Sequence, residues 1–400
     1  MEPNPFLGVI FHWIGGFCSA TNFVPFRQIK RWSWEVYWIV QGFAAWIVAP
    51  AVLACIFIPH PYGILHDVFA TDPKVVLYAF LFGVLWGVGA IAFGLAIRYL
   101  GIALGYAITL GLCAFFGTLI PYIYQGQIIS LFHQTSGQII LLGIVVCILG
   151  VGISGAAGHS KEQEMTVEVK LEAGERDYNF PRGIAIAILA GFMSSFFAFG
   201  LTAGRPIGDL TSTRLIAAGL TGRVVLKDLP VLVVVLWGGF VTNFIWSAIL
   251  IFQNGSIKQF FGEPGINPMR AVATSGDTLV DFDPLDPSTY DRLAPSTLFA
   301  NYLFAALAGV LWYLQFFFYS VGITRMGKYD FSSWTMHIAS ILVFASLWGL
   351  VFREWRGTSM RTKVLVTCGL ALLVGSTVIV GYGNYLQSPL AAYPQTTALR

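Results

Sequence analysis

The sequence predicts an all-α polytopic membrane protein with ten transmembrane helices arranged as a 5+5 inverted repeat. Three observations predict the membrane class: only 11% of the 400 residues are charged, 56% are hydrophobic, and the mean hydropathy is +0.72. An ordinary soluble domain carries about 25% charged residues and could not hide this much apolar surface. The net charge of +3 is too small and too dispersed to direct the chain to nucleic acid.

Ten continuous apolar segments are each long enough to cross a bilayer, which takes about 20 helical residues. They cover residues 5–25, 34–57, 75–97, 101–123, 137–157, 182–203, 229–252, 297–320, 332–352 and 362–384. Because these segments lack the alternation of transmembrane strands, each is predicted to be a helix. No Lys or Arg precedes the first segment, so it is predicted to be retained and not to be a cleaved signal peptide.

Two hydrophilic stretches divide the chain. Residues 158–181 are predicted to be a hydrophilic linker, and residues 253–296 an acidic, Pro-rich insertion. The first half, residues 1–157, and the second half, residues 182–400, each have five predicted spans. Because five is an odd number, the two halves have opposite orientations in the membrane. This is the arrangement of an inverted-repeat transporter, whose substrate site lies between the halves. The acidic run in the insertion lacks the residue order of a calcium loop, so no metal site is predicted.

The distribution of Lys and Arg predicts the orientation. In the first half, the side that carries the linker has Arg27, Lys30, Arg31, Arg98, Lys161, Lys170, Arg176 and Arg182, and the opposite side has Lys74. Since cytoplasmic loops are enriched in Lys and Arg, we expect a multi-pass protein of the bacterial inner membrane with its linker in the cytoplasm and its termini outside. In the second half, Arg205, Arg214, Arg223 and Lys227 oppose this assignment.

Ionisable residues in or beside the spans are the candidates for proton coupling, because charge is costly in a bilayer and is retained there for function. No Asp or Glu lies near the middle of a predicted span. The nearest acids are Glu35, which opens the second span, and Asp330, just before the ninth. His12 and His337 are the histidines inside spans, and an imidazole can exchange a proton as a site opens to either side.

His12 shares a helix face with Gly8, Gly15, Gly16 and Ser19, at spacings of three and four residues. Small residues let another helix or a ligand approach closely. The pattern has two interpretations: a helix contact with His12 hydrogen-bonded across it, or a proton or substrate site. For His337 in the ninth span, the same two interpretations stay open: a structural histidine or a proton coupler.

The eighth span contains an aromatic run that ends at Tyr319, and positions 312, 315, 316 and 319 form one helical face. Aromatic rings stack on the apolar faces of sugars, and amides bond their hydroxyl groups. The candidate substrate-binding residues are therefore Trp312, Tyr313, Gln315, Tyr319 and Trp334. An aromatic packing stripe is the alternative.

Residues 26–38 combine basic residues with three tryptophans directly after the first span. Such a combination is typical of an anchor at the lipid headgroups, which is the prediction here. A role for Glu35 in a gate or a proton relay is the alternative.

Signatures of enzymes and pumps are missing from the sequence. Residues 150–155 form a GxGxxG pattern, but they close a membrane span and no βαβ unit follows. The sequence has no Walker A loop, zinc signature or GxSxG motif. We therefore expect no enzyme, no catalytic residues and no cofactor, but a transporter driven by the proton gradient. Its expected partners are a sugar-like small molecule, protons and the lipid bilayer, and its oligomeric state is left open.

Three stretches resemble the L-rhamnose–proton symporter family, within the drug/metabolite transporter superfamily. They are residues 12–15 continuing through 25–27 to 32–35; residues 82–87 continuing through 98–101 to 117–119; and residues 312–319 with Tyr329, Asp330, Trp334 and His337, ending at 353–355. The resemblance covers most of the chain. It implies the ten helices of the family and the proton-coupled uptake of L-rhamnose or a related deoxysugar.

The chain departs from this family in its third span. Typical members place asparagines after the Trp-Gly pair, whereas residues 89–94 here are Gly-Ala-Ile-Ala-Phe-Gly. Loss of groups that bond sugar hydroxyls can change specificity. Transport or export of a different small solute on the same fold is therefore the alternative. A third hypothesis, a non-transporting membrane sensor or structural subunit, predicts a dry, fully packed space between the halves.

Overall fold

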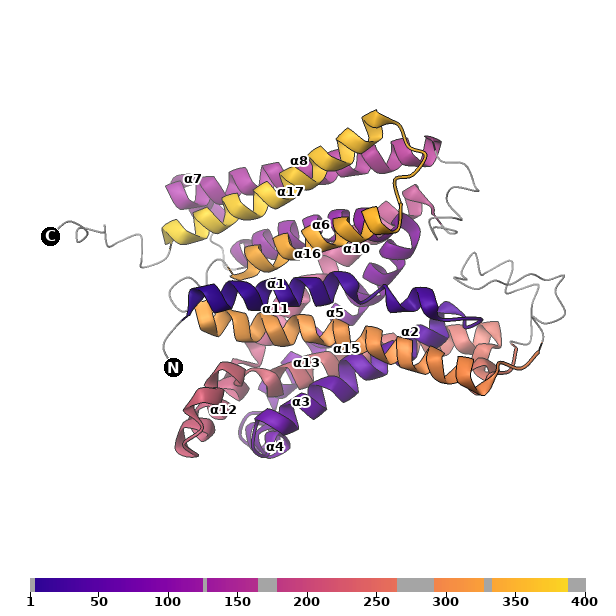
Figure 1. Cartoon of the computed structure of the whole chain (residues 1–400). Coiled ribbons are helices and arrows are strands. Elements are labelled where there is room, and N and C mark those ends of the chain that lie inside the picture. Colours follow the sequence, from indigo (N-terminus) through magenta and orange to yellow (C-terminus); the bar gives the residue numbers. More distant parts are fainter. Residues whose placement is uncertain (1–3, 125–127, 165–177, 265–290, 327–332, 388–400) are drawn as a thin grey trace.

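The computed structural model describes residues 4–124, 128–164, 178–264, 291–326 and 333–387. Every regular element in these ranges is a helix, and the long helices lie roughly side by side (Figure 1). The bundle has two ends. We call the end at which α4 and α12 lie the α12 end, and the end at which α2 begins the α2 end.

The helices alternate in direction between these ends. Those of the first half are α1 (Pro5–Thr21), η1 (Pro25–Gln28), α2 (Trp34–Gly42), η2 (Phe43–Val48), α3 (Ala49–Phe57), α4 (Pro61–Thr71), α5 (Pro73–Leu100), α6 (Ile102–Tyr124), α7 (Ile128–His133) and α8 (Thr135–Glu164). Those of the second half are α10 (Phe180–Ser194), α11 (Phe196–Ala203), α12 (Arg205–Ala217), η3 (Thr221–Leu226), α13 (Leu229–Asn254), η4 (Ser256–Phe261), α15 (Pro295–Met326), α16 (Ser333–Val351) and α17 (Met360–Gln387).

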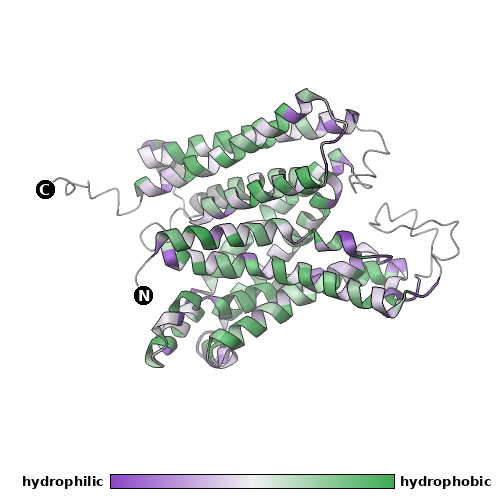
Figure 2. Cartoon of the chain, viewed as in Figure 1, coloured by the Kyte–Doolittle hydropathy of each residue, from purple (hydrophilic) through white to green (hydrophobic). Residues whose placement is uncertain are grey.

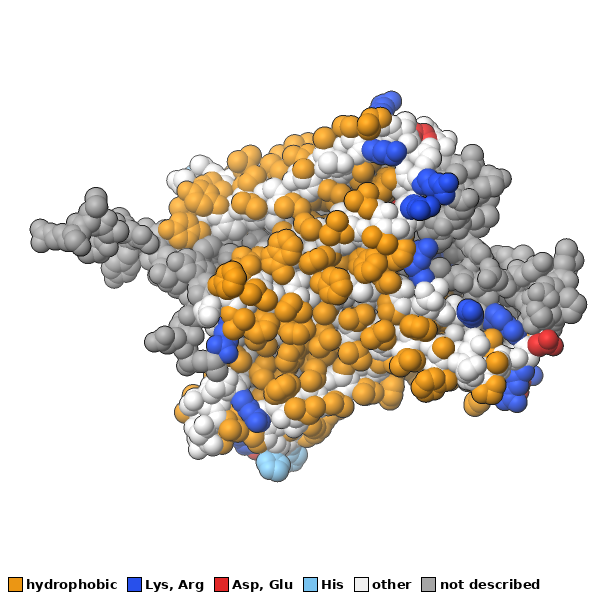
Figure 3. Space-filling model, viewed as in Figure 1, with side chains coloured by type: hydrophobic (Ala, Val, Ile, Leu, Met, Phe, Trp, Pro, Cys, Tyr) orange, Lys and Arg blue, Asp and Glu red, His pale blue; other side chains and the backbone are white. Residues whose placement is uncertain are grey.

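Eight helical segments of the described chain are long and apolar enough to cross a membrane. Two shorter apolar helices, Ile102–Gly117 and Met336–Val351, lie where the fourth and ninth spans were predicted. Hydrophobic residues cover the middle of the visible face, and Lys and Arg gather toward its ends (Figures 2 and 3). The all-helical, multi-pass membrane class is thus confirmed, whereas the count of ten spans and the 5+5 repeat stay predictions.

Two predicted single helices are interrupted in the structure. The second span contains the π-helix η2, just before Pro50, whose ring cannot supply a helical N–H donor. The sixth span is divided at Ser195 into α10 and α11, and the Ser195 hydroxyl donates to the Phe192 carbonyl at 2.7 Å. These interruptions bring Trp46 of η2 and Phe197 of α11 to the centre of the bundle.

Glycines bring α1 into close contact with α15 and α16. A Cβ atom added at Gly8 would lie 2.7 Å from the sulfur of Met326, and one at Gly15 would lie 3.0 Å from Cε1 of His337. A Cβ atom on Gly322 of α15 would lie 2.8 Å from Cε1 of His12. The close helix approach predicted from the glycine face is therefore confirmed, and it joins the two ends of the chain.

A polar bridge joins α2, α5 and α13. The Trp38 indole donates to the Asn243 side-chain oxygen at 2.9 Å, and the Asn243 amide donates to the carbonyls of Gly87 at 3.1 Å and Gly239 at 2.8 Å. Asn243 is fully buried, so these bonds satisfy an amide that would otherwise be costly inside the membrane. The bridge fixes the two halves to each other beside the central tryptophans.

The headgroup anchor predicted for residues 26–38 is wrong. Trp32, Trp34 and Trp38 are buried within the protein, and the rings of Trp34 and Trp38 stack 4.8 Å apart. The Trp32 indole donates to the Gln259 carbonyl at 2.8 Å. Contacts with η4, which comes from a distant part of the sequence, cover tryptophans that the local pattern placed at the lipid surface.

Helix α8 extends into the predicted linker. Residues 158–164, assigned to the linker, continue α8, and Lys161 is buried there with its ammonium group 4.8 Å from the ring of Trp355. Residues 165–177 of the linker and residues 265–290 of the insertion lie outside the described residues.

Glu354 caps the start of α6. Its two carboxylate oxygens accept hydrogen bonds from the backbone N–H groups of Ile102 at 2.9 Å and Ala103 at 3.0 Å. Because the first N–H groups of a helix lack partners within it, we expect Glu354→Ala to destabilise the protein by about 2–4 kcal/mol. Thermal unfolding in detergent, followed by tryptophan fluorescence, measures this. Glu354→Gln, which keeps an acceptor, should lose less, and an unchanged melting temperature in both variants would contradict the prediction.

Glu164 joins the end of α8 to the start of α17. Its carboxylate accepts bonds from the Ser359 N–H at 2.5 Å and the Thr362 hydroxyl at 2.9 Å. These hydrogen bonds, above all the one from the Ser359 backbone N–H, lower the pKa of Glu164 from the usual 4.5 to about 2. The stabilisation is therefore present above pH 4.5 and is lost as the pH falls from 4.5 to about 2. We expect hydrogen exchange in the first turn of α17 to accelerate over this range, and Glu164→Gln to remove the pH dependence.

Candidate functional site

A cavity of about 100 Å³, which we call the inner cavity, lies between the two halves of the chain. Residues of α1, α2, η2, α5 and α6 line it on one side, and residues of α10, α11, α15 and α16 line it on the other. A sensor with a fully packed space between its halves would lack such a cavity. Its position between the halves is the one expected for the substrate site of a transporter.

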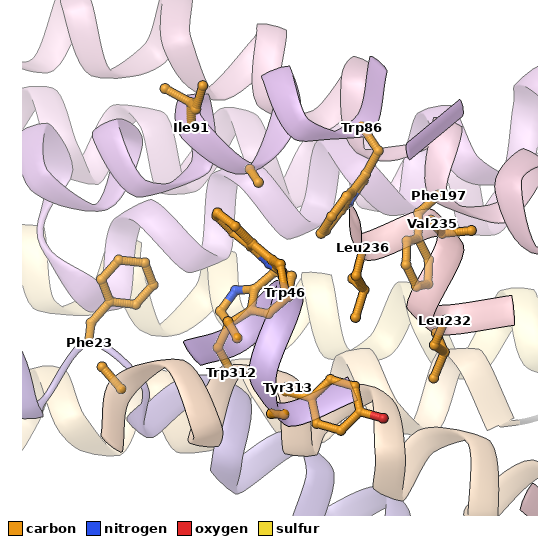
Figure 4. Packing of buried hydrophobic residues seen from close by; sticks show 14 of the residues in the cluster. Phe23, Trp46, Trp86, Ile91, Phe197, Leu232, Val235, Leu236, Trp312 and Tyr313 are labelled. Carbon is orange, nitrogen blue, oxygen red and sulfur yellow. The ribbon is translucent and has the colours of Figure 1, made fainter. Parts of the chain in front are cut away.

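Three tryptophans form the centre of the inner cavity. The ring centroid of Trp312 lies 5.3 Å from that of Trp46 and 5.4 Å from that of Trp86 (Figure 4). Trp46 and Trp312 meet edge to face, at an interplanar angle of 88°. Trp46 and Trp86 are not among the candidates predicted from the sequence, although Trp86 belongs to one of the stretches that carry the family resemblance.

A polar group from each half of the chain reaches the inner cavity without a hydrogen-bond partner among the described residues. The Gln315 side chain is largely buried, yet it forms no hydrogen bond with the part of the chain that the structure describes. The indole N–H of Trp46 is also buried without a partner among the described residues. Since buried polar groups are normally bonded, these two groups are available to a polar ligand or to water.

The two histidines lie together at one side of the inner cavity. The ring centroid of His337 lies 5.1 Å from that of Tyr319 and 6.1 Å from that of His12, and the His12 and Tyr319 rings lie 5.5 Å apart. His337 and Tyr319 line the cavity, and His12 lies behind them. Three titratable side chains from α1, α15 and α16 therefore meet in one cluster.

The imidazoles of this cluster have few hydrogen-bond partners. Both ring nitrogens of His12 and Nδ1 of His337 are buried without a partner in the described ranges. The remaining nitrogen of His337 bonds to the backbone of His12. Ser340 donates to the His12 carbonyl at 3.1 Å. The cross-helix hydrogen bond expected for the His12 ring is therefore not formed, and its nitrogens stay available for a proton or a ligand.

Tyr313 and Glu35 do not line the inner cavity. Tyr313 is fully buried on another face of α15, where its hydroxyl has no partner within the described chain. Glu35 lies at the α2 end, where its carboxylate accepts bonds from Asn254 at 3.0 Å and Ser256 at 2.8 Å. Asp330 lies outside the described residues. Of the substrate candidates, Trp312, Gln315, Tyr319 and Trp334 do line the cavity.

Aromatic rings cover the inner cavity toward the α2 end. Phe93 and Tyr106 meet edge to face with centroids 5.1 Å apart, and Phe23 lies 6.1 Å from Tyr106. The Tyr106 hydroxyl donates to the Ser19 carbonyl and accepts a bond from the Asn22 amide at 3.1 Å. These bonds join α1 to α6 beside the cavity.

Residues 89–94 of the third span form an apolar part of the cavity wall, because Ala90 and Phe93 line the cavity there. Side chains that can form hydrogen bonds line it from both halves, among them Ser19, Gln315 and His337. Among the described residues, no group of three or more His, Cys, Asp or Glu side chains could hold a metal ion.

Comparison with known proteins adds a family match. A family model described as L-rhamnose-proton symport protein matches residues 1–266 and 287–385. Proteins named L-rhamnose-proton symporter from Salmonella paratyphi B and Klebsiella pneumoniae are each 31% identical to the chain over 380 residues. Each match covers 94% of this chain and 97% of the relative. No solved structure matches the chain. The match is interrupted at residues 267–286, which lie within the predicted insertion, and it ends before residues 386–400.

Proposed function

The chain belongs to the L-rhamnose-proton symport protein family, and we propose that it takes up L-rhamnose together with protons. Members of this family are transporters and not enzymes. The observation that carries the proposal is the similarity to named symporters over 94% of the chain. It does not favour the alternative of a different solute on the same fold.

The inner cavity suits the chemistry of this sugar. L-Rhamnose is neutral, with hydroxyl groups on the rim of its ring and apolar C–H and methyl groups. The rings of Trp312 and Trp334 offer apolar faces, and the Gln315 amide and the Tyr319 hydroxyl offer hydrogen bonds. The apolar wall at Ala90 and Phe93 suits the methyl side of a deoxysugar.

His337 and His12 are the proposed proton carriers. A protonated imidazole in this apolar site is costly unless its N–H groups find acceptors. The oxygens of a bound sugar would supply acceptors beside His337, so sugar binding favours proton uptake and, by linkage, proton uptake favours sugar binding. The bonds of Glu35 to Asn254 and Ser256 give it a role in joining α2 to η4, away from this exchange. Asp330 remains a further candidate.

The proposal includes the arrangement in the membrane. Ten spans form two inverted five-helix repeats in the inner membrane, with the linker in the cytoplasm. No cofactor is required, because the proton gradient supplies the driving force. The meeting of α1 with α15 and α16, and of α5 with α13, supports a site between the halves.

Purified protein in proteoliposomes tests the function. With an imposed pH gradient, acid outside, we expect labelled L-rhamnose to accumulate above its external concentration and a protonophore to abolish the accumulation. Liposomes without protein serve as the control. Absence of uptake by correctly inserted protein would refute the proposal.

A further inference from the structure

A second cavity, of about 360 Å³, lies at the α12 end, and we call it the vestibule. Residues of α11, α12, α13 and α15 line it, together with Lys227 and Asp228 between η3 and α13. Its volume lies within the range of small-molecule sites, about 300–1,000 Å³, whereas the inner cavity is smaller. The vestibule therefore has room for a monosaccharide, and it is the larger of the two cavities.

An aromatic partition separates the two cavities. Phe197, Phe316 and Tyr319 line both of them. The rings of Phe197 and Phe316 lie 4.6 Å apart at an angle of 40°. In Figure 4, Phe23 lies on the left, and Phe197 and Leu232, which line the vestibule, lie to the right of Trp86. A ligand in the vestibule thus meets aromatic rings, one of which belongs to the histidine cluster.

Four charged residues surround the rest of the vestibule: Arg205, Asp209, Lys227 and Asp228. Lys227 pairs with Asp209 at 3.4 Å. Neither the Arg205 side chain nor the Asp228 side chain has a hydrogen bond or ion pair within the described parts of the chain. Two positive and two negative groups give no net charge, so the lining favours a neutral ligand with hydroxyl groups over an ion. A free carboxylate and a free guanidinium together accept from and donate to such hydroxyls.

The Asp228 carboxylate lies close against α12. A Cβ atom added at Gly208 of α12 would lie 2.6 Å from Oδ1 of Asp228, so a larger residue at position 208 would displace the carboxylate. The vestibule residues Thr202, Arg205 and Asp209 are exposed, which leaves its mouth accessible.

We propose that the vestibule is an outer sugar-binding site, in which Asp228 and Arg205 bond the hydroxyl groups and Phe316 and Tyr319 contact the ring. The inference rests on the proposed function and adds a second site to it. The sugar occupies this site before the partition of Phe197, Phe316 and Tyr319 opens to the inner cavity.

Kinetics and a thiol probe test the outer site. In proteoliposomes, we expect Asp228→Ala to raise the KM for L-rhamnose about tenfold and to change kcat by less than about twofold, because the bond is made on binding. Asp72→Asn is the matched control, since Asp72 lies exposed at the same end, caps α5 and does not line the vestibule. In a Thr202→Cys variant, L-rhamnose should slow labelling of the thiol by a water-soluble methanethiosulfonate reagent. Adding Asp228→Ala should remove this protection.

The outcomes are distinct. An unchanged KM in Asp228→Ala, or labelling of Cys at position 202 that L-rhamnose does not slow, would overturn the outer site while wild-type uptake still supported the proposed function. A lower kcat with a shifted pH profile at unchanged KM would instead assign Asp228 to proton transfer and also overturn it. Absence of wild-type uptake would refute the proposed function and this inference together.

Discussion

Replacing His337 by Gln is expected to abolish proton-driven accumulation of L-rhamnose while leaving exchange of the sugar intact. Gln keeps a side-chain N–H for the bond to the His12 backbone but cannot take up a proton. Without a titrating group, the pH gradient no longer shifts the sugar equilibrium, so the accumulation ratio should fall to about one. Accumulation under an imposed gradient and counterflow without one measure the two properties separately.

The control for this variant is His66→Gln, because His66 is exposed at the α12 end and lies away from the inner cavity. It should accumulate sugar like the wild type. Undiminished proton-driven accumulation in His337→Gln would remove His337 from the coupling mechanism. Loss of both accumulation and exchange would show that the residue is needed for sugar binding or folding and would contradict a purely coupling role.

Replacing Gln315 by Leu is expected to raise the KM for L-rhamnose about 10- to 100-fold without destabilising the protein. The amide has no partner among the described residues, so its removal deprives the sugar of hydrogen bonds and leaves no protein group unpaired. A buried amide replaced by an apolar side chain of similar size is neutral or stabilising. Initial uptake rates and the melting temperature in detergent together test this.

Tyr313→Phe serves as the comparison on the same helix. Tyr313 lies outside the inner cavity and its buried hydroxyl has no partner in the described residues, so we expect wild-type KM and an unchanged or higher melting temperature. A KM within about twofold of wild type in Gln315→Leu would contradict a role for the amide in sugar binding. A raised KM in Tyr313→Phe would support the sequence-based assignment of Tyr313 to the site.

Helix positions could be predicted closely because each long apolar segment must satisfy its own backbone hydrogen bonds inside the bilayer. The interruptions could not. The π-helix at 43–48 and the break at Ser195 lie inside continuously apolar segments, so the hydropathy pattern that located the spans did not mark them. These interruptions decide which aromatic rings reach the inner cavity.

The candidate site was also predicted only in part from the sequence. Periodicity placed Trp312, Gln315 and Tyr319 on one helix face, and the structure turns that face toward the cavity. Adjacency in the sequence also suggested Tyr313, which lies on another face of α15. Asp228 was missed because it stands at the start of a span, where an acid is ordinarily solvated, and only the vestibule distinguishes it.

The sequence by itself determined the membrane class, the places where helices form and the family, because each follows from local composition and from motifs. Only the tertiary structure decided which faces meet. His12 and His337 lie near opposite ends of the chain, and no local pattern joins them. Gly15 and Gly322 remove the side chains that would hold α1, α15 and α16 apart, and the resulting contact places both imidazoles beside Tyr319. Helical periodicity specifies a side of one helix, whereas a site requires sides of several helices to face a common space.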